Sequence, residues 1–492
     1  MTDEGTRVEA SYRKRVMRPL VWIRRDLRLT DNTALIRACE AATDGCVAVF
    51  AITPQQWQEH DEAPAKVEFW LENLRALHEA LAAKNIPLKI VTTDEYDGLP
   101  NVLLDAARSV GADSLWMNRE HEVNERRRDA AVTEAFEADD HEVHAFDDHT
   151  VLPPLDVRTK QGGPYSVFSP YKRAWIEVAK QSAIDPLGTP ATQQEIDVTA
   201  DAVPGSIKGF DFGTARLDLW PAGEDAAQGK LGAFIGQRIA SYEDRRDLPG
   251  TNGTSTISPY LAAGVISPRQ ALHAALGANR NRFANGSKGA DTWISELIWR
   301  EFYQQVLRAF PRVSMHRAFR PDLDERVVWR DDPEGLEAWK EGMTGVPIVD
   351  GAMRQLKQTG WMHNRLRMVV AMFLSKNLLI DWREGERHFM RHLIDGDLGA
   401  NNGGWQWSAS VGTDAAPYFR IFNPISQSER FDPDGKFLHR FVPELEGVTG
   451  KDLHDPRRLG DIDRRGRGYP EMIVDPKSSR QRAIDAFKEA SN

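Results

Sequence analysis

The sequence predicts two domains of different class: an N-terminal α/β domain with a doubly wound parallel sheet, and a C-terminal all-α domain. Short apolar runs alternate with helical patterns over roughly the first 150 of the 492 residues. Strands that alternate with helices indicate βαβ units and hence a parallel sheet. After about Gly229 the apolar residues follow only helical spacing, interrupted by Gly and Pro.

Five apolar runs are the expected strands of the α/β domain, which we place over residues 19–150. They cover residues 19–24, 46–52, 88–91, 114–117 and 142–146, with helices expected over 34–40, 67–83, 102–109 and 123–136. In such a domain, ligands bind at the carboxyl ends of the strands. RRDLRLTDN follows the first strand in place of a glycine-rich fingerprint, so a standard NAD site is not expected.

Residues 151–228 are rich in Pro, Gly and polar residues and are predicted to link the domains. One helix is expected near 171–181, and a long surface loop over 185–221. The helical domain is placed over residues 229–492. Its helices are expected over 231–244, 268–275, 291–310, 350–358, 361–379 and 383–393.

Composition and cysteine content exclude several classes of protein. No apolar run is long enough for a transmembrane helix, and residues 1–18 are polar, which argues against a secretory signal and favours a disordered lead. Cys39 and Cys46 are the only cysteines, which excludes a disulfide framework and a cysteine-rich metal site and is consistent with a reducing cytosol. We therefore expect a cytoplasmic protein without a membrane anchor or a metal.

The stretch IDGDLGANNGGWQW, residues 394–407, combines two aspartates, two asparagines and two tryptophans with glycines. Asp and Asn side chains need hydrogen-bond partners when they are buried, and glycines let the chain pass close to a flat group. Two interpretations remain open: an Asx-rich loop leading into a buried aromatic helix, or the site of a polar, planar ligand.

Two further segments each allow a structural and a functional interpretation. GTNGTSTIS, residues 250–258, is either an N-capping loop or a cradle for a pyrophosphate. WISELIWREFY, residues 293–303, is expected to be a helix in which Glu296 either pairs with Arg300 or faces a heterocycle between aromatic walls. The residues that share one face of this helix are Trp293, Glu296, Trp299 and Arg300.

A cluster of cations follows in a segment without Asp or Glu, residues 351–380. Its members are Arg354, Lys357, Arg365, Arg367 and Lys376. They indicate either a solvated basic helix face or a phosphate-binding face. Within this segment WMHNRLRM, residues 361–368, is expected to present Trp361, Asn364, Arg365 and Met368 on one side of a helix. Eight of the fourteen tryptophans lie between positions 293 and 407, which fits core packing and electron transfer equally well.

These segments, in this order, resemble the DNA photolyase/cryptochrome family, and most closely its class I bacterial cyclobutane pyrimidine dimer photolyases. The resemblance covers nearly the whole chain. It begins with VWIRRDLRLTDN (21–32), EVNERRRD (122–129) and YSVFSPYKRAW (165–175). It is dense in ISPYLAAGVISPRQ (257–270), WISELIWREFY, TGWMHNRLRM, DWREGERHFM, IDGDLGANNGGWQW and GTDAAPYFRIFNP (412–424).

The resemblance implies one FAD, folded into a U, in the helical domain. The positions that match the family's cofactor contacts are Tyr242, Thr254, Ser255, Thr256, Ile257, Ser258, Trp293, Asn364, Arg367, Asp395, Gly396, Asp397 and Asn401. Among these, Asn401 matches the residue that faces flavin N5. Trp405, Trp382 and Trp329 match a three-step chain that carries an electron from the surface to the flavin.

The resemblance also implies ultraviolet-damaged DNA, single- or double-stranded, as the partner of a monomeric enzyme. Glu296 matches the acid that forms a hydrogen bond with the lesion bases. The positions that match lesion or phosphate contacts are Arg246, Glu296, Trp299, Arg300, Asn364, Arg365, Met368 and Trp407.

An antenna chromophore is implied between the domains, near Asn124 and Glu125. Two positions depart from the family pattern. Thr256 stands where the family's TSRLS motif has Arg, and Met315 aligns with a Lys that flanks a folate antenna in close relatives. Methenyltetrahydrofolate is the first expectation for the antenna, and a deazaflavin is the second.

The function implied is light-driven repair of cyclobutane pyrimidine dimers, in which the dimer is flipped out of the helix and receives an electron from excited reduced FAD. Three alternatives stay open. The 6–4 photolyases carry a pair of His where this chain has Asn364 and Met368. Cryptochrome-type blue-light receptors signal without repair and usually add a long C-terminal tail. A flavin-binding scaffold without a DNA role is the third.

Overall fold

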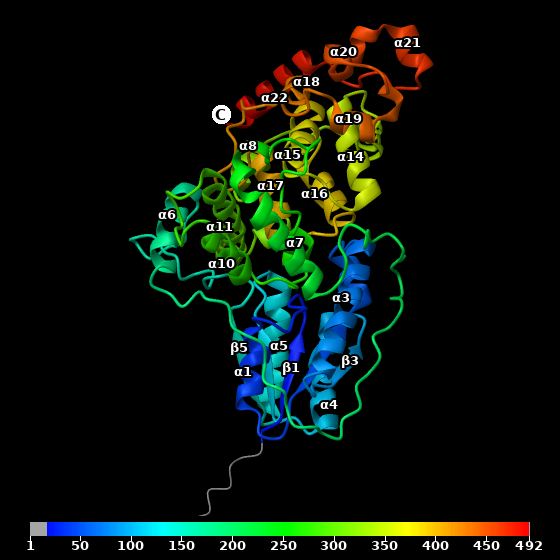
Figure 1. The fold of residues 1–492 in the computed structure, drawn as a ribbon. Coiled ribbons are helices and arrows are strands. Elements are labelled where there is room, and N and C mark those ends of the chain that lie inside the picture. Colours follow the sequence, from blue (N-terminus) through cyan, green and yellow to red (C-terminus); the bar gives the residue numbers. More distant parts are fainter. Residues whose placement is uncertain (1–16, 492) are drawn as a thin grey trace, which may run out of the picture.

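The computed structural model describes residues 17–491, so residues 1–16 of the expected disordered lead lie outside the described part. The first part of the chain forms a five-stranded parallel sheet in the order β3-β2-β1-β4-β5 (Figure 1). The strands are β1 (Pro19–Ile23), β2 (Val47–Ile52), β3 (Leu88–Thr92), β4 (Ser114–Asn118) and β5 (Glu142–Phe146). All five predicted strands are confirmed, with every end within one residue of its expected position.

Helices cover both faces of the sheet, as its continuous apolar strands require. They are α1 (Thr33–Ala41), α2 (Pro54–Glu59), α3 (Pro64–Ala82), the short η1 (Tyr96–Gly98), α4 (Leu99–Val110) and α5 (Val123–Ala138). Successive strand residues point to opposite faces. Val21, Ile23, Ala48 and Phe50 pack with residues of α1 and α3 in one core, while Leu20, Trp22, Val47 and Val49 pack with α4 and α5 in the other. The predicted doubly wound α/β domain is confirmed.

The connection between the two parts follows the α/β domain closely. After α6 (Phe168–Ala179), residues 180–223 contain no helix or strand. This segment runs back along the sheet edge (Figure 1), where Asp201 pairs with Lys89 and its N–H donates to the carbonyl of Leu88 at 2.8 Å. The long surface loop expected over 185–221 is confirmed.

The remaining described residues form helices and loops only. The helices are α7 (Glu224–Gln237), η2 (Ile239–Ser241), α8 (Tyr242–Arg245), α9 (Ser258–Ala262), α10 (Pro268–Ala278), α11 (Lys288–Ala309), η3 (Val313–Met315), α12 (Pro321–Asp324), α13 (Pro333–Glu341), α14 (Pro347–Thr359), α15 (Asn364–Met372), η4 (Phe373–Leu378), α16 (Trp382–Met390), α17 (Leu398–Ala409), α18 (Pro424–Phe431), α19 (Lys436–Phe441), η5 (Pro443–Leu445), α20 (Gly450–His454), η6 (Pro456–Leu459), α21 (Asp461–Gly466) and α22 (Pro476–Ser491). None of the helices within residues 17–491 is both long and apolar enough to cross a bilayer.

Two expected helices have different boundaries. The helix expected over 361–379 begins only at Asn364, because the imidazole of His363 caps it by accepting the N–H of Arg365 at 3.2 Å. The expectation that Trp361 lies on this helix was therefore wrong. The helix expected over 231–244 is divided into α7, η2 and α8, because the backbone leaves helical geometry at Arg238.

Candidate functional site

Four charged side chains alternate in sign beside α11. Arg246 pairs with Glu296, and Arg365 pairs with Asp247 at 2.7 Å. Arg246 Nε also lies 3.9 Å from Asp247 Oδ1. Burial raises the pKa of Glu296, and the charge of Arg246 only partly opposes this effect. The alternative pairing of Glu296 with Arg300 is not formed, so Glu296 belongs to a cluster assembled from separate elements.

Trp299 and Arg300 were both predicted to contact the lesion; Trp299 packs on α6, and Arg300 contacts the end of the α/β domain. The ring of Trp299 stacks on Phe168 with centroids 3.6 Å apart and planes 8° apart, and Tyr303 lies at 5.6 Å. Arg300 donates a hydrogen bond to the carbonyl of His149. The structure thus places Trp299 in a rigid aromatic stack and Arg300 at the junction of the domains.

A cavity of about 130 Å³ unites several residues predicted to hold the flavin. Its lining is Asn364, Arg367, Met368, Ala371, Phe389, Ala400, Asn401, Gly404, Trp405 and Ser408. A Cβ on Gly404 would meet no atom within 4 Å, whereas one on Gly403 would lie 2.2 Å from the Tyr303 ring. Gly403 therefore lets α17 pack on α11, and Gly404 leaves an open wall. Asn401 is nearly buried and donates to the carbonyl of Glu386 at 3.0 Å.

The two aspartates of the 394–407 stretch are fixed by partners on the protein. Arg367 donates to both carboxylate oxygens of Asp395, at 2.8 and 2.9 Å. Asp397 caps α17 by accepting the N–H of Ala400 at 2.8 Å, and its other oxygen accepts from Gln304 at 3.2 Å. Gly396 lies between them, and the Cβ that it lacks would meet no atom closer than 3.2 Å. The structural alternative for this stretch is confirmed, since an Asx cap begins a helix that contains the buried Trp405.

A second cavity, of about 430 Å³, opens against the predicted pyrophosphate loop. Its lining includes Thr254, Thr256, Trp361 and His363. Thr256 has a φ of +52°, which is unfavourable for a β-branched residue and indicates local strain. Trp361 donates to the hydroxyl of Ser258 at 3.2 Å.

His363 supplies a buried polar atom that has no partner on the protein. The residue is 3% exposed, and its Nε2 forms no hydrogen bond with any described residue. Burial lowers the pKa of His363 to about 4, so the ring is neutral at pH 7. A buried polar atom without a partner is the kind of group that a polar ligand satisfies.

The residues present therefore fit an FAD. Asn401, the open wall at Gly404 and Met368 surround one cavity, and His363 with the loop at Thr254 borders the other. The remaining predicted contacts lie on the elements that frame these cavities. Tyr242 and Trp293 are buried against Phe234 at 5.7 and 5.1 Å, and Ser255 and Ile257 belong to the loop itself.

The three tryptophans of the expected electron chain lie in the helical domain and differ in burial. Trp405 and Trp382 are buried, and Trp329 is partly exposed. Helices α16 and α17 pack so closely that a Cβ on Gly385 would lie 2.0 Å from Trp405. The indole of Trp382 donates to Asp324 at 3.0 Å. Trp407, two residues beyond Trp405, is half-buried on another face of α17.

The five cations of residues 351–380 do not form one phosphate-binding face. Lys376 is fully buried, and its ammonium donates to the carbonyl of Ala409 at 3.1 Å and the hydroxyl of Ser410 at 3.0 Å. Arg354 pairs with Glu444 and Lys357 with Glu341. Only Arg365 and Arg367 border the candidate site. The interpretation of the segment as a single face was wrong, because helical geometry distributes the cations around α14, α15 and η4.

The predicted antenna residues lie at the start of α5 with two partners that sequence reasoning missed. Asn124 contacts His60 Nε2 at 3.1 Å, and Glu125 accepts from the hydroxyl of Tyr96 at 3.2 Å and lies 3.4 Å from His60 Nδ1. The N–H of Val123 donates to Ser314 at 3.0 Å, which places the Met315 segment beside this group.

Two further partners could not be found from spacing in the sequence. Asp247 holds Arg365, and Glu386 accepts a hydrogen bond from Asn402 at 3.0 Å as well as from Asn401. Glu386 lies in the conspicuous segment DWREGERHFM, which was a signal of its importance but gave no indication of its role. No group of three or more His, Cys, Asp or Glu side chains within residues 17–491 is arranged to hold a metal ion.

Comparison with known proteins agrees with this geometry along the whole chain. Residues 19–191 match the family model described as DNA photolyase, and residues 293–489 match the model described as the FAD binding domain of DNA photolyase. Deoxyribodipyrimidine photo-lyases of Salmonella typhimurium and Escherichia coli are each 43% identical over 96% of this chain and 98% of their own length.

Solved structures show the same arrangement. A bacterial class III photolyase from Agrobacterium tumefaciens superposes with a TM-score of 0.86 at 35% identity, covering 98% of this chain and 99% of that chain. An archaeal photolyase from Sulfolobus tokodaii, described with two FAD molecules, gives a TM-score of 0.81 at 28% identity over 96% of this chain and all of that chain. From its matched domains, its full-length relatives and its cavities, the chain belongs to the DNA photolyase family and carries that family's FAD-binding domain.

Proposed function

We propose that this chain is a deoxyribodipyrimidine photo-lyase that splits cyclobutane pyrimidine dimers in damaged DNA with blue light. The full-length relatives at 43% identity carry that name. The observation that carries the proposal is the lining of the flavin cavity, where Asn364 and Met368 accompany Asn401. A 6–4 photolyase is disfavoured by the same residues, because the two positions that hold His in that group hold an amide and a thioether here.

Reduced FAD, when bound and illuminated, supplies the electron that splits the dimer. The protein has to bind the lesion, orient it and exclude water. Arg246 and Arg365 are the cations next to the site, and both are held by carboxylates, Glu296 and Asp247. A DNA phosphate that approaches either guanidinium competes with its carboxylate, so binding of DNA releases Glu296 and Asp247. Flipping of the dimer costs less than flipping a normal base because its pairing is already weakened.

Glu296 is then free to act as a hydrogen-bond donor. Burial already raises the pKa of this carboxyl group, and loss of the Arg246 partner removes the charge that opposes the rise. A protonated Glu296 can donate to a carbonyl oxygen of the dimer, where negative charge develops after electron transfer. Asn401 is a neutral amide fixed by the Glu386 carbonyl, so it presents a hydrogen-bonding group without an acidic proton.

The proposed antenna is a folate near His60, Asn124 and Glu125. A pocket at the carboxyl ends of β1 and β2 is lined by Trp22, Trp57 and Trp70 and extends to Glu125, and its volume is only about 50 Å³. Pockets for small-molecule ligands usually measure about 300–1,000 Å³. The proposal of a folate therefore rests on the resemblance to the family and on Asn124 and Glu125, while Met315 supplies no charge beside them.

Both cysteines are free and buried, in keeping with work in the reducing cytosol beside the chromosome. The test of the proposal is the repair of an oligonucleotide with a single thymine dimer. Loss of the dimer in blue light, with none in the dark and none for a 6–4 lesion, is expected. A protein that binds FAD and DNA but leaves both lesions intact in light would instead be a receptor.

A further inference from the structure

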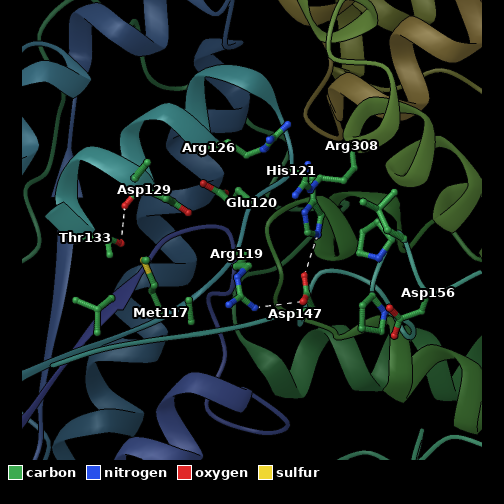
Figure 2. A pocket seen from close by; sticks show the side chains of 16 residues that line it. Met117, Arg119, Glu120, His121, Arg126, Asp129, Thr133, Asp147, Asp156 and Arg308 are labelled. Carbon is green, nitrogen blue, oxygen red and sulfur yellow. Dashed lines mark hydrogen bonds and ion pairs between the residues drawn. The ribbon is translucent and has the colours of Figure 1, made fainter. Parts of the chain in front are cut away.

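A crevice formed by α5, β4, β5 and the end of α11 lies apart from the flavin and lesion residues (Figure 2). Its volume of about 550 Å³ is within the usual range for pockets that bind small organic molecules. Its apolar lining includes Met117, Val143, Ala145, Pro153, Pro154 and Leu155. Arg308, which also lines it, is twelve residues beyond Glu296 on α11, or about 18 Å along the helix axis.

Two guanidinium groups meet at one side of this crevice. Arg126 comes from α5 and Arg308 from the last turn of α11, and both also line an adjoining cavity of about 370 Å³. Burial and the nearby charge of Arg308 lower the pKa of Arg126. Neither guanidinium forms a hydrogen bond or ion pair with another part of the chain that the structure describes. The adjoining cavity adds a third cation, Arg158, and its described lining contains no acidic residue.

A buried imidazole points to a ligand independently of these arginines. His121 is 3% exposed, and its Nε2 has no hydrogen-bond partner among residues 17–491. The nearest carboxylate oxygen, on Asp147, is 3.6 Å away, and Arg308 is close enough to lower the pKa of His121, an effect secondary to burial. In Figure 2 the ring reaches into the crevice from between Arg308 and Asp147.

Most of the carboxylates in the lining are already neutralised. Glu120 pairs with Arg25 and Arg128, and Asp129 pairs with Arg24 and Arg128, all on the α/β side. Asp147 lies 3.3 Å from Arg119. Asp156 is exposed at the rim. The uncompensated positive charge is therefore concentrated where Arg126 and Arg308 face the adjoining cavity.

We propose that this crevice binds a phosphomonoester of about the size of a mononucleotide. Its dianionic phosphate would lie between Arg126 and Arg308, because each guanidinium group can donate two parallel hydrogen bonds to phosphate oxygens. The apolar wall would take the body of the ligand, and His121 would satisfy its free Nε2 on a polar atom of it. The site differs from the predicted antenna position, because the Glu125 carboxylate is turned to Tyr96 and His60.

The experiment uses FAD-loaded protein, so that the adenosine part of the flavin site is closed. Calorimetric titration at low salt compares adenosine 5′-monophosphate, adenosine and inorganic phosphate. We expect one equivalent of the monophosphate to bind, phosphate to bind more weakly, and adenosine not to bind. Arg126→Gln should weaken binding of the monophosphate by about tenfold or more, since charge-assisted hydrogen bonds are lost.

Arg127→Gln is the matched control, because Arg127 is exposed, adjacent on α5 and outside the lining. It should leave binding unchanged. Arg126 has no partner on the protein to lose, so Arg126→Gln should also keep the unfolding temperature of the ligand-free protein. The proposal is overturned if the monophosphate gives no binding heat, if adenosine binds as tightly, or if both variants weaken binding equally. It is also overturned if Arg126→Gln weakens only the binding of dimer-containing DNA, which would make the crevice part of the DNA surface.

Discussion

The arginines near the flavin and lesion residues have carboxylate partners, whereas the two arginines of the crevice between α5 and α11 have none in the part of the chain that the structure describes. Arg246, Arg365 and Arg367 each have a carboxylate partner, whereas Arg126 and Arg308 have none among residues 17–491. A paired arginine is fixed in position, but a ligand must displace its carboxylate. An unpaired arginine can bind an anion directly, because no carboxylate has to be displaced. We infer that the paired arginines near the lesion are held in a fixed orientation and release their carboxylates when DNA binds. The unpaired arginines of the crevice can bind an anion directly.

The largest effect should come from breaking the pair that frames the flavin cavity. Asp395→Ala would leave the half-buried Arg367 without its carboxylate partner, at a cost of about 1.5–3 kcal/mol for the lost charge-assisted hydrogen bonds. We expect the purified variant to lose FAD, measured as the flavin absorbance that remains after gel filtration. Asp434→Ala is the control, because Asp434 pairs with Lys436 on the exposed surface. Retention of FAD by the Asp395 variant would show that this pair does not shape the cavity.

Removing the carboxylate partner of Arg246 should lower the repair rate without lowering the affinity for DNA. Glu296→Ala removes the proposed donor to the dimer and makes Arg246 resemble the arginines of the crevice. We expect the repair rate in light to fall by about a hundredfold, the lower end of the range for other lost donors to a developing negative charge. The affinity for dimer-containing DNA, measured by fluorescence anisotropy, should not fall. An affinity that fell as far as the rate would mean that Glu296 serves binding alone.

Glu301 tests what an ionisable group without an ion pair contributes when that group is a carboxyl and not a guanidinium. This buried carboxyl on α11 forms no ion pair within residues 17–491, and it accepts from the N–H groups of Val151 and Leu152 and from the indole of Trp175. Burial raises the pKa of Glu301 to about 7. Because the folded state binds this proton more tightly than the unfolded state, its stabilising effect is present at low pH and is lost as pH rises through 7.

The free energy of unfolding should therefore fall by about 2.5 kcal/mol between pH 5 and pH 8 on account of this group. Glu301→Gln should flatten that part of the profile, as measured by urea denaturation at several pH values. Glu337→Gln, at an exposed position on α13, should leave the profile unchanged. A slope that survives in the Glu301 variant would assign it to another group.

The smallest effect concerns salt. Binding of dimer-containing DNA should weaken with salt at a log–log slope of roughly −3 to −5, for about four or five phosphate contacts. Arg365→Gln should reduce the magnitude of this slope by about one. Arg126→Gln should not change it, because the crevice is not part of the DNA surface. A salt response that is flat in the wild type would favour a flavin-binding scaffold without a DNA role.

The sequence predicted the α/β domain better than the arrangement of charges. Strands such as 46–52 are continuous apolar runs, so periodicity and length suffice to find them. The start of α15 was misplaced because His363 acts as a cap, which is uncommon for this residue type. Lys376 was assigned to the surface, although its ammonium is satisfied inside the core by Ala409 and Ser410.

The partners of the site residues could not be predicted because they are distant in the sequence. Asp247 is 118 positions from Arg365, and Glu296 is 50 positions from Arg246. Arg126 lies in the segment EVNERRRD, but the sequence did not indicate that Arg308 would lie beside it, since the two are joined only by the packing of the two domains. Resemblance to the family predicted the flavin positions, and the structure showed which of the cations have no partner among residues 17–491.

The central claim is that reduced FAD in this helical domain transfers an electron to a bound pyrimidine dimer. The most direct measurement counts thymine dimers restored per protein molecule after single flashes of blue light, with FAD-reduced holoenzyme saturated with dimer-containing oligonucleotide. The account predicts restored thymines in proportion to the flashes and none in the dark. A holoenzyme that binds the oligonucleotide and absorbs the flash, but leaves every dimer joined, would contradict it.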